Sequence, residues 1–176
     1  MKGYTTTIGS TIYFPHASQA ALRPITSSIT LLHELVHMYD ARRISNPVFG
    51  FLYLTPQVLV LLLWPLFFIL PWWLVVPMMV LLLMPIPSFC RMYFERRAYI
   101  SSLYVEYQLA RKLGIRPLLN SYRGLFLKEF KSSSYYFMWP FSLDNDFDEA
   151  ITKIRAGQRP FEDPVFDILD ELIETI

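Results

Sequence analysis

The chain of 176 residues is long enough for one domain of ordinary size and too short for two independent cores. Apolar residues make up 53% of it and charged residues only 18%, against roughly 25% charged residues in an average globular chain. The net charge of +1 hides a basic segment, residues 91–131, that is followed by an acidic one, residues 132–176. This charge pattern beside an apolar run is typical of proteins at a membrane surface and argues against a nucleic-acid partner. The single cysteine, Cys90, excludes a disulfide bond within the chain.

The first unit, residues 1–43, is expected to contain a β-hairpin and one helix. Residues 4–14 are rich in Thr, Ile, Tyr and Phe and are interrupted by Gly9, a pattern that predicts two strands joined by a tight turn. Ser27 or Ser28 can cap a helix that then continues to the end of the unit.

The second unit, residues 44–90, contains no Asp, Glu, Lys, Arg or His. Pro71 divides its apolar part into residues 52–70 and 72–89, and a helix of either length is roughly 28 Å long, close to the hydrocarbon thickness of a bilayer. The sequence therefore predicts a helical hairpin in the membrane with two tryptophans at its tip. Seven prolines within the unit must kink or shorten these helices, so both a hairpin that crosses the bilayer and a re-entrant hairpin remain open.

Arginines flank the uncharged run on both sides. Arg42 and Arg43 precede it, and Arg91, Arg96 and Arg97 follow it. Because arginines favour the cytoplasmic side of a membrane, we expect both ends of the hairpin on that side and an even number of crossings.

The third unit, residues 91–131, begins with a predicted helix that is closed by Gly114 and continues as a basic segment suited to a membrane surface. The fourth unit, residues 132–176, is an acidic helical tail whose last helix is expected from Val165 to Ile176. This tail can dock on the basic segment, cover the active site, bind a partner or stay solvated.

The sequence His33-Glu34-Leu35-Val36-His37 is the HExxH pattern. On a helix, residues four apart lie on one face, so the two imidazoles can bind the same metal ion. Glu34 projects beside that ion, where it can act as the catalytic base toward a metal-bound water.

A catalytic zinc site needs a third protein ligand. The candidates are His16, Asp40, Glu95 and Glu106. We favour Glu95, because an even number of crossings returns the chain to the face where the two histidines lie.

Four further residues are candidates for supporting roles. Asp40, one turn after His37, can orient an imidazole, and Tyr39, Tyr93 or Tyr99 can stabilise the oxyanion of a tetrahedral intermediate.

The motif followed by a distant glutamate resembles the gluzincin arrangement, and more closely the integral-membrane peptidases of the Ste24 and HtpX type. In those proteins membrane helices separate HExxH from a Glu-x-x-Ala-Asp motif on the cytoplasmic side. Residues Glu95 to Ala98 match the first part of that motif, and Tyr99 stands at the aspartate position. The resemblance implies zinc, ligated by His33, His37 and Glu95.

A second resemblance covers residues 5–37, which are similar to the metallopeptidase domain found beside bacterial contractile injection systems. The two resemblances agree on zinc, the active-site helix and the catalytic base. The chain as a whole predicts an α+β, mainly α fold: a minimal zincin-like domain with an N-terminal β-hairpin, in which a membrane hairpin separates the HExxH helix from the glutamate helix.

The sequence thus predicts an integral membrane zinc metallopeptidase that acts on peptides or membrane-protein segments, with its active site on the cytoplasmic face. The alternative is a non-catalytic structural protein that is membrane-anchored, pore-forming or delivered by a virion. The oligomeric state is open.

Overall fold

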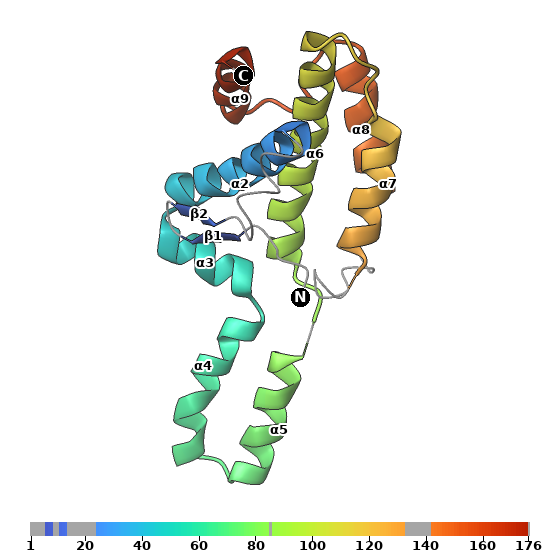
Figure 1. Cartoon of the computed structure of the whole chain (residues 1–176). Helices are drawn as coiled ribbons and strands as arrows, with labels where there is room; N and C mark the ends of the chain where they lie inside the picture. Colours follow the sequence, from blue (N-terminus) through green and yellow to red (C-terminus); the bar gives the residue numbers. More distant parts are fainter. Residues whose placement is uncertain (1–5, 9–10, 14–23, 85, 133–141, 176) are drawn as a thin grey trace.

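The computed structural model describes residues 6–8, 11–13, 24–84, 86–132 and 142–175 (Figure 1). His16, one of the candidate ligands, lies outside these residues. Two short strands come first, β1 (Thr6–Ile8) and β2 (Thr11–Tyr13). The helices and 3-10 helices follow in the order α2 (Pro24–Ile44), α3 (Asn46–Leu54), η1 (Gln57–Leu59), α4 (Val60–Leu63), η2 (Trp64–Phe68), α5 (Trp72–Leu83), α6 (Phe89–Lys112), α7 (Leu119–Phe130), α8 (Asp144–Arg155) and α9 (Val165–Thr175).

Helix α6 is the centre of the fold and packs against α2, α3, α7, α8 and α9 (Figure 1). Its first turn is capped by Ser88, whose hydroxyl accepts a hydrogen bond from the backbone N–H of Arg91 at 3.3 Å. It ends at Gly114, whose φ of 66° favours glycine, and the N–H of Ile115 closes the helix on the carbonyl of Ala110 at 2.9 Å. The helix therefore begins and ends within two residues of the positions that the sequence predicts.

A single apolar core joins the helices on either side of the hairpin. Fully buried side chains come from α2 (Val36), α6 (Leu103 and Val105), α8 (Phe147) and α9 (Phe166). Residues from the first, third and fourth sequence units thus share one core, and the apolar second unit projects from it (Figure 1).

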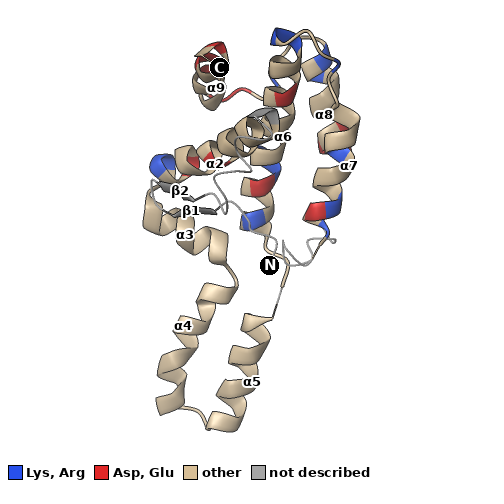
Figure 2. Cartoon of the chain, in the orientation of Figure 1, with Lys and Arg blue, Asp and Glu red and all other residues tan. Residues whose placement is uncertain are grey.

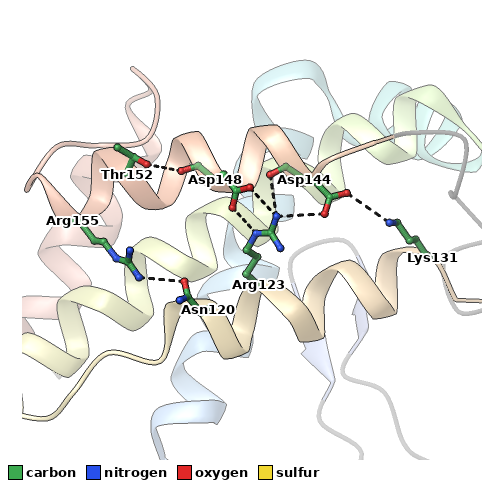
Figure 3. A network of polar contacts seen from close by, with 7 residues as sticks. All are labelled: Asn120, Arg123, Lys131, Asp144, Asp148, Thr152 and Arg155. Carbon is green, nitrogen blue, oxygen red and sulfur yellow. Dashed lines mark hydrogen bonds and ion pairs between the residues drawn. The ribbon is translucent and has the colours of Figure 1, made fainter.

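The acidic tail docks on the basic segment. Arg123 on α7 binds Asp148 on α8, with Nη2 to Oδ2 at 2.9 Å, and it also contacts Asp144 at 3.4 Å (Figure 3). Lys131 adds a contact to Asp144 at 3.7 Å (Figure 3). These pairs are partly exposed and contribute little individually, so the apolar faces of α8 and α9 supply most of the attachment.

The prediction of an α+β, zincin-like fold is wrong, because helices make up the fold. The expected N-terminal β-hairpin consists of only two strands of three residues each, which pair antiparallel with Thr7 opposite Ile12. A ribbon of this length cannot form a layer over the helices, although the β-branched residues of this segment favour strands locally. The described core contains no strand residue.

The helices of the apolar hairpin are interrupted and shortened, as its prolines predict. The residue before Pro56, Thr55, is extended, with ψ at 137°, and ends α3. The first arm then continues as short 3-10 and α-helical pieces through Phe68, with Pro65 in the first turn of η2. The second arm is α5, with Pro77 inside it. Proline geometry thus breaks the long apolar segments into shorter helices.

No single helix in the described chain is long and apolar enough to cross a membrane, while the pair 46–54 and 57–68, bent by 97°, meets those criteria together. The hairpin surface is apolar and exposed. Phe68 is 86% exposed, Ile69 77% and Trp72 70%, and Figure 2 shows no charged residue on either arm. The apolar side chains of the hairpin therefore face outward instead of forming a core.

The docked tail predicts a strong dependence of stability on α9. Phe166→Ala removes a fully buried ring that packs against Tyr104 at 5.0 Å, and we expect it to lower the free energy of unfolding by about 3–5 kcal/mol. Ile168→Ala on the same helix, where the side chain is 36% exposed, is the matched control and should cost less than about 1 kcal/mol. Urea unfolding followed by circular dichroism measures both, and equal losses would contradict the docked tail.

Candidate metal centre

Helix α2 crosses α6 (Figure 1), and its two HExxH histidines contact Glu95 on α6. Leu32 and Val36 are buried in the core that α2 shares with α6, which fixes the rotation of α2. His33 and His37 lie beside this buried stripe, with ring centroids 5.0 Å apart and nearly perpendicular planes. The spacing of four residues thus places both imidazoles on the side of α2 that faces α6, as the sequence predicts.

Glu95 on α6 completes the group, and its side chain is only 2% exposed. Its carboxylate faces both rings: Nε2 of His33 lies 3.6 Å from Oε2, and Nε2 of His37 lies 3.5 Å from Oε1. One ligand atom from each of the three residues lies within 4.8 Å of the others. His33, His37 and Glu95 can therefore hold a metal ion.

The polar atoms at this site fit a bound cation. Oε2 of Glu95 and Nδ1 of His37 are buried and have no hydrogen-bond partner among the described residues. A buried carboxylate oxygen without a partner is costly, and a cation next to it removes that cost. Two imidazole nitrogens and one carboxylate oxygen form a donor set that zinc accepts.

Burial and charge–charge attraction oppose each other in this group. Burial disfavours the ionised form of Glu95, but the attraction of His37 and the close polar contacts of both imidazoles together outweigh it and hold the pKa of Glu95 well below its usual value. Burial also lowers the pKa of His37, but Glu95, with a smaller contribution from Glu34, raises that pKa above 6.5 overall. Without a metal, the group therefore behaves as a buried ion pair.

Glu34 follows His33 directly and is half-buried. Its charge contributes to the raised pKa of His37, which places its carboxylate near the imidazoles. Glu34 is not one of the three clustered ligands.

Ser102 holds the ring of His33, a contact that the sequence analysis missed. Nδ1 of His33 lies 3.2 Å from Oγ of Ser102, and that hydroxyl donates to the carbonyl of Ala98 at 2.9 Å. Since the hydroxyl proton is directed at Ala98, Oγ accepts from Nδ1–H of His33, and Nε2 is left to bind a metal. The available signal was the spacing of seven residues from Glu95, which puts Ser102 on the same face of α6 two turns later.

Tyr99 packs against the ring of His33, with a centroid distance of 4.8 Å, and it is 7% exposed. Tyr99 thus lies beside the metal group, as a candidate supporting residue should.

Tyr39 and Asp40, two other candidate supporting residues, contact Arg97 and not the metal group. Asp40 forms a buried ion pair with Arg97, and the guanidinium stands over the ring of Tyr39 at 5.6 Å. Arg97 also pairs with Asp163 at 2.8 Å. These contacts join α2, α6 and the segment before α9, so Asp40 holds the two ligand-bearing helices together.

The competing third ligands are engaged elsewhere where the structure describes them. Asp40 pairs with Arg97, and Oε1 of Glu106 accepts a hydrogen bond from the backbone N–H of Leu118 at 2.7 Å. Glu95 therefore lies where the even number of predicted crossings puts the third ligand, beside the two histidines.

Aromatic residues of α3 close the side of the site nearest the hairpin. The ring of Tyr53 lies 5.9 Å from His37 in an edge arrangement, and its hydroxyl donates a hydrogen bond to Oε1 of Glu95. Phe49 stacks on Tyr53 at 5.7 Å. The sequence analysis assigned all of α3 to the membrane hairpin and so missed Tyr53.

The buried pair predicts a pH optimum for the stability of the metal-free protein. Because the pKa of His37 is raised, its contribution is complete below its unfolded value of 6.5 and is lost as the pH rises through the folded pKa. Because the pKa of Glu95 is lowered, its contribution is complete above 4.5 and is lost as the pH falls through the folded pKa. We expect the unfolding midpoint of chelator-treated protein to fall between pH 6 and pH 8.5, and this fall to disappear in His37→Gln. An unchanged midpoint in metal-free wild type would contradict the ion pair.

Comparison with family models, curated proteins and solved structures finds no match to the chain. The function therefore has to be argued from the site itself.

Proposed function

We propose that this protein is a membrane-embedded, zinc-dependent metallopeptidase. The observation that carries the proposal is the convergence of the two HExxH histidines on Glu95, with Glu34 beside them. Two ligands from one helix and a glutamate from a second helix leave room for the water that a hydrolytic zinc site requires.

Zinc bound there would supply a polarised water and a Lewis acid for the scissile carbonyl. Glu34 would accept a proton from the attacking water and pass it to the leaving amine. Ser102 keeps Nε2 of His33 directed at the metal by accepting from Nδ1–H. Peptide hydrolysis needs no other chemical group, which is why this reaction class fits best.

The hairpin supports a membrane location for this site. Each arm beyond α3, residues 57–68 and 72–83, has 12 residues and is about 18 Å long, close to half of the roughly 30 Å hydrocarbon thickness. That length suits a hairpin that enters one leaflet and returns, with the exposed Phe68, Ile69 and Trp72 at its deepest point.

The contacts of the hairpin support a site at the membrane surface. Both arms return to the domain next to the metal group, since α3 packs on α6 and Gln57 donates to the carbonyl of Met84 at 3.2 Å. The flanking arginines favour the cytoplasmic face. The substrates are then peptides or membrane-protein segments that reach this surface.

Zinc content and the role of Glu34 test the enzymatic proposal. We expect about one zinc per chain in wild type by elemental mass spectrometry, and its loss in His33→Ala and Glu95→Ala. Glu34→Gln should keep the zinc and the unfolding midpoint and reduce cleavage of a quenched fluorescent peptide library by about 10²–10⁴-fold.

The exposed Glu162→Ala is the matched control and should retain both zinc and activity. A folded wild type that binds no added zinc would overturn the proposal. Undiminished cleavage by Glu34→Gln would overturn the assigned base.

Tryptophan quenching tests the membrane proposal. In vesicles containing lipids brominated on their acyl chains, we expect quenching of the hairpin tryptophans Trp64, Trp72 and Trp73, measured in a Trp139→Phe background. Phe68→Asp combined with Ile69→Asp should abolish the quenching, because charges in the hydrocarbon region are costly. Ile115→Asp, at an exposed apolar residue outside the hairpin, is the control. Emission unaffected by brominated lipid would contradict insertion.

A further inference from the structure

The two oxygens of the Glu95 carboxylate have different surroundings. Oε1 accepts a hydrogen bond from the hydroxyl of Tyr53, while Oε2 is buried without a hydrogen-bond partner among the described residues. A carboxylate held in this way offers one defined oxygen to a cation, because the bond from Tyr53 restricts rotation of the group.

The position of Tyr53 is fixed by contacts with both ligand-bearing helices. Its backbone carbonyl accepts a hydrogen bond from Nε of Arg91 at 3.1 Å, and the guanidinium stands over its ring at 5.0 Å. Arg91 precedes Glu95 by four residues, so both lie on the same face of α6. On the other side, the ring packs against His37 of α2 at 5.9 Å. Tyr53 is thus placed relative to two of the three ligands.

We propose that Tyr53 is a positioning residue that orients Glu95 for the metal, so that Oε2 binds the ion. The inference rests on the metal centre of the proposed function and adds a residue that the HExxH motif does not contain. Tyr53 belongs to α3, the helix through which the chain enters the hairpin. The apolar insertion therefore contributes a polar group to the site as well as a membrane anchor.

A tyrosine that only packs at this place would behave differently from one that orients a ligand. Phenylalanine preserves the ring contacts with His37, Phe49 and Arg91 and removes only the hydroxyl. Loss of a hydrogen bond to a metal ligand typically costs 10- to 100-fold in metal affinity. Loss of a packing tyrosine's hydroxyl leaves metal affinity unchanged.

The test is the zinc affinity of full-length Tyr53→Phe, measured by competition with a chromogenic chelator, together with the visible spectrum of the cobalt-loaded protein. We expect the dissociation constant to rise about 10- to 100-fold and the cobalt bands to shift as the carboxylate changes its binding mode. Tyr93→Phe is the matched control: it lies on α6 two residues before Glu95, 45% exposed, and its ring contacts Phe94 away from the metal group. This variant should match wild type.

Equal affinities and identical cobalt spectra for wild type and Tyr53→Phe would overturn the inference while leaving the metal centre intact. Failure of wild type to bind either metal would overturn the proposed function itself. Should Tyr53→Phe lose helical circular dichroism, Arg91→Lys gives the second test, since it removes the Nε donor that holds the tyrosine. Weaker zinc binding by Arg91→Lys supports the inference, and unchanged binding contradicts it.

Discussion

The structure depends on the crossing of α2 over α6, which buries the Glu95 carboxylate between two imidazoles. A buried carboxylate is stable only when opposite charge or hydrogen bonds compensate for lost hydration. In the metal-free protein His37 supplies that charge, and in the proposed enzyme the zinc ion does. The same three side chains therefore form a buried ion pair in the metal-free state and would bind the metal in the other. The packing of Val36 and Leu103 in the core keeps the two histidines facing Glu95.

The remaining contacts maintain this crossing. Arg97 pairs with Asp40 on α2 and with Asp163 before α9, so one buried guanidinium joins three parts of the chain. Buried ion pairs of this kind add little net stability but disfavour other arrangements of the helices. The acidic tail belongs to this scaffold through α8 and α9, and three aspartates of α8 (Asp144, Asp146 and Asp148) pair with arginines of the basic segment.

The local motif and the return of the chain were predictable from the sequence, whereas the supporting contacts were not. Helical periodicity places the two HExxH histidines on one face of their helix. Arginines on both sides of the apolar run predicted that both ends of the hairpin lie on one side of the membrane, so that residue 95 can meet residues 33 and 37. The α+β class was wrong because the strand-favouring residues near the N-terminus form only a short two-stranded ribbon, whereas the shortening of the hairpin helices follows from the prolines, as the sequence predicts. Tyr53 and Ser102 carry no motif. Their roles follow from tertiary packing, which a single sequence does not show.

The most direct test of the metal centre is X-ray absorption spectroscopy at the zinc edge of the metal-loaded protein. A site formed by His33, His37 and Glu95 predicts two imidazole nitrogens with carboxylate and water oxygens, all at about 2.0–2.2 Å. Glu95→Gln should alter the oxygen contribution and leave the imidazole scattering in place. A sulfur ligand at about 2.3 Å, which only Cys90 or a methionine could supply, or a shell without imidazole scattering, would contradict the account.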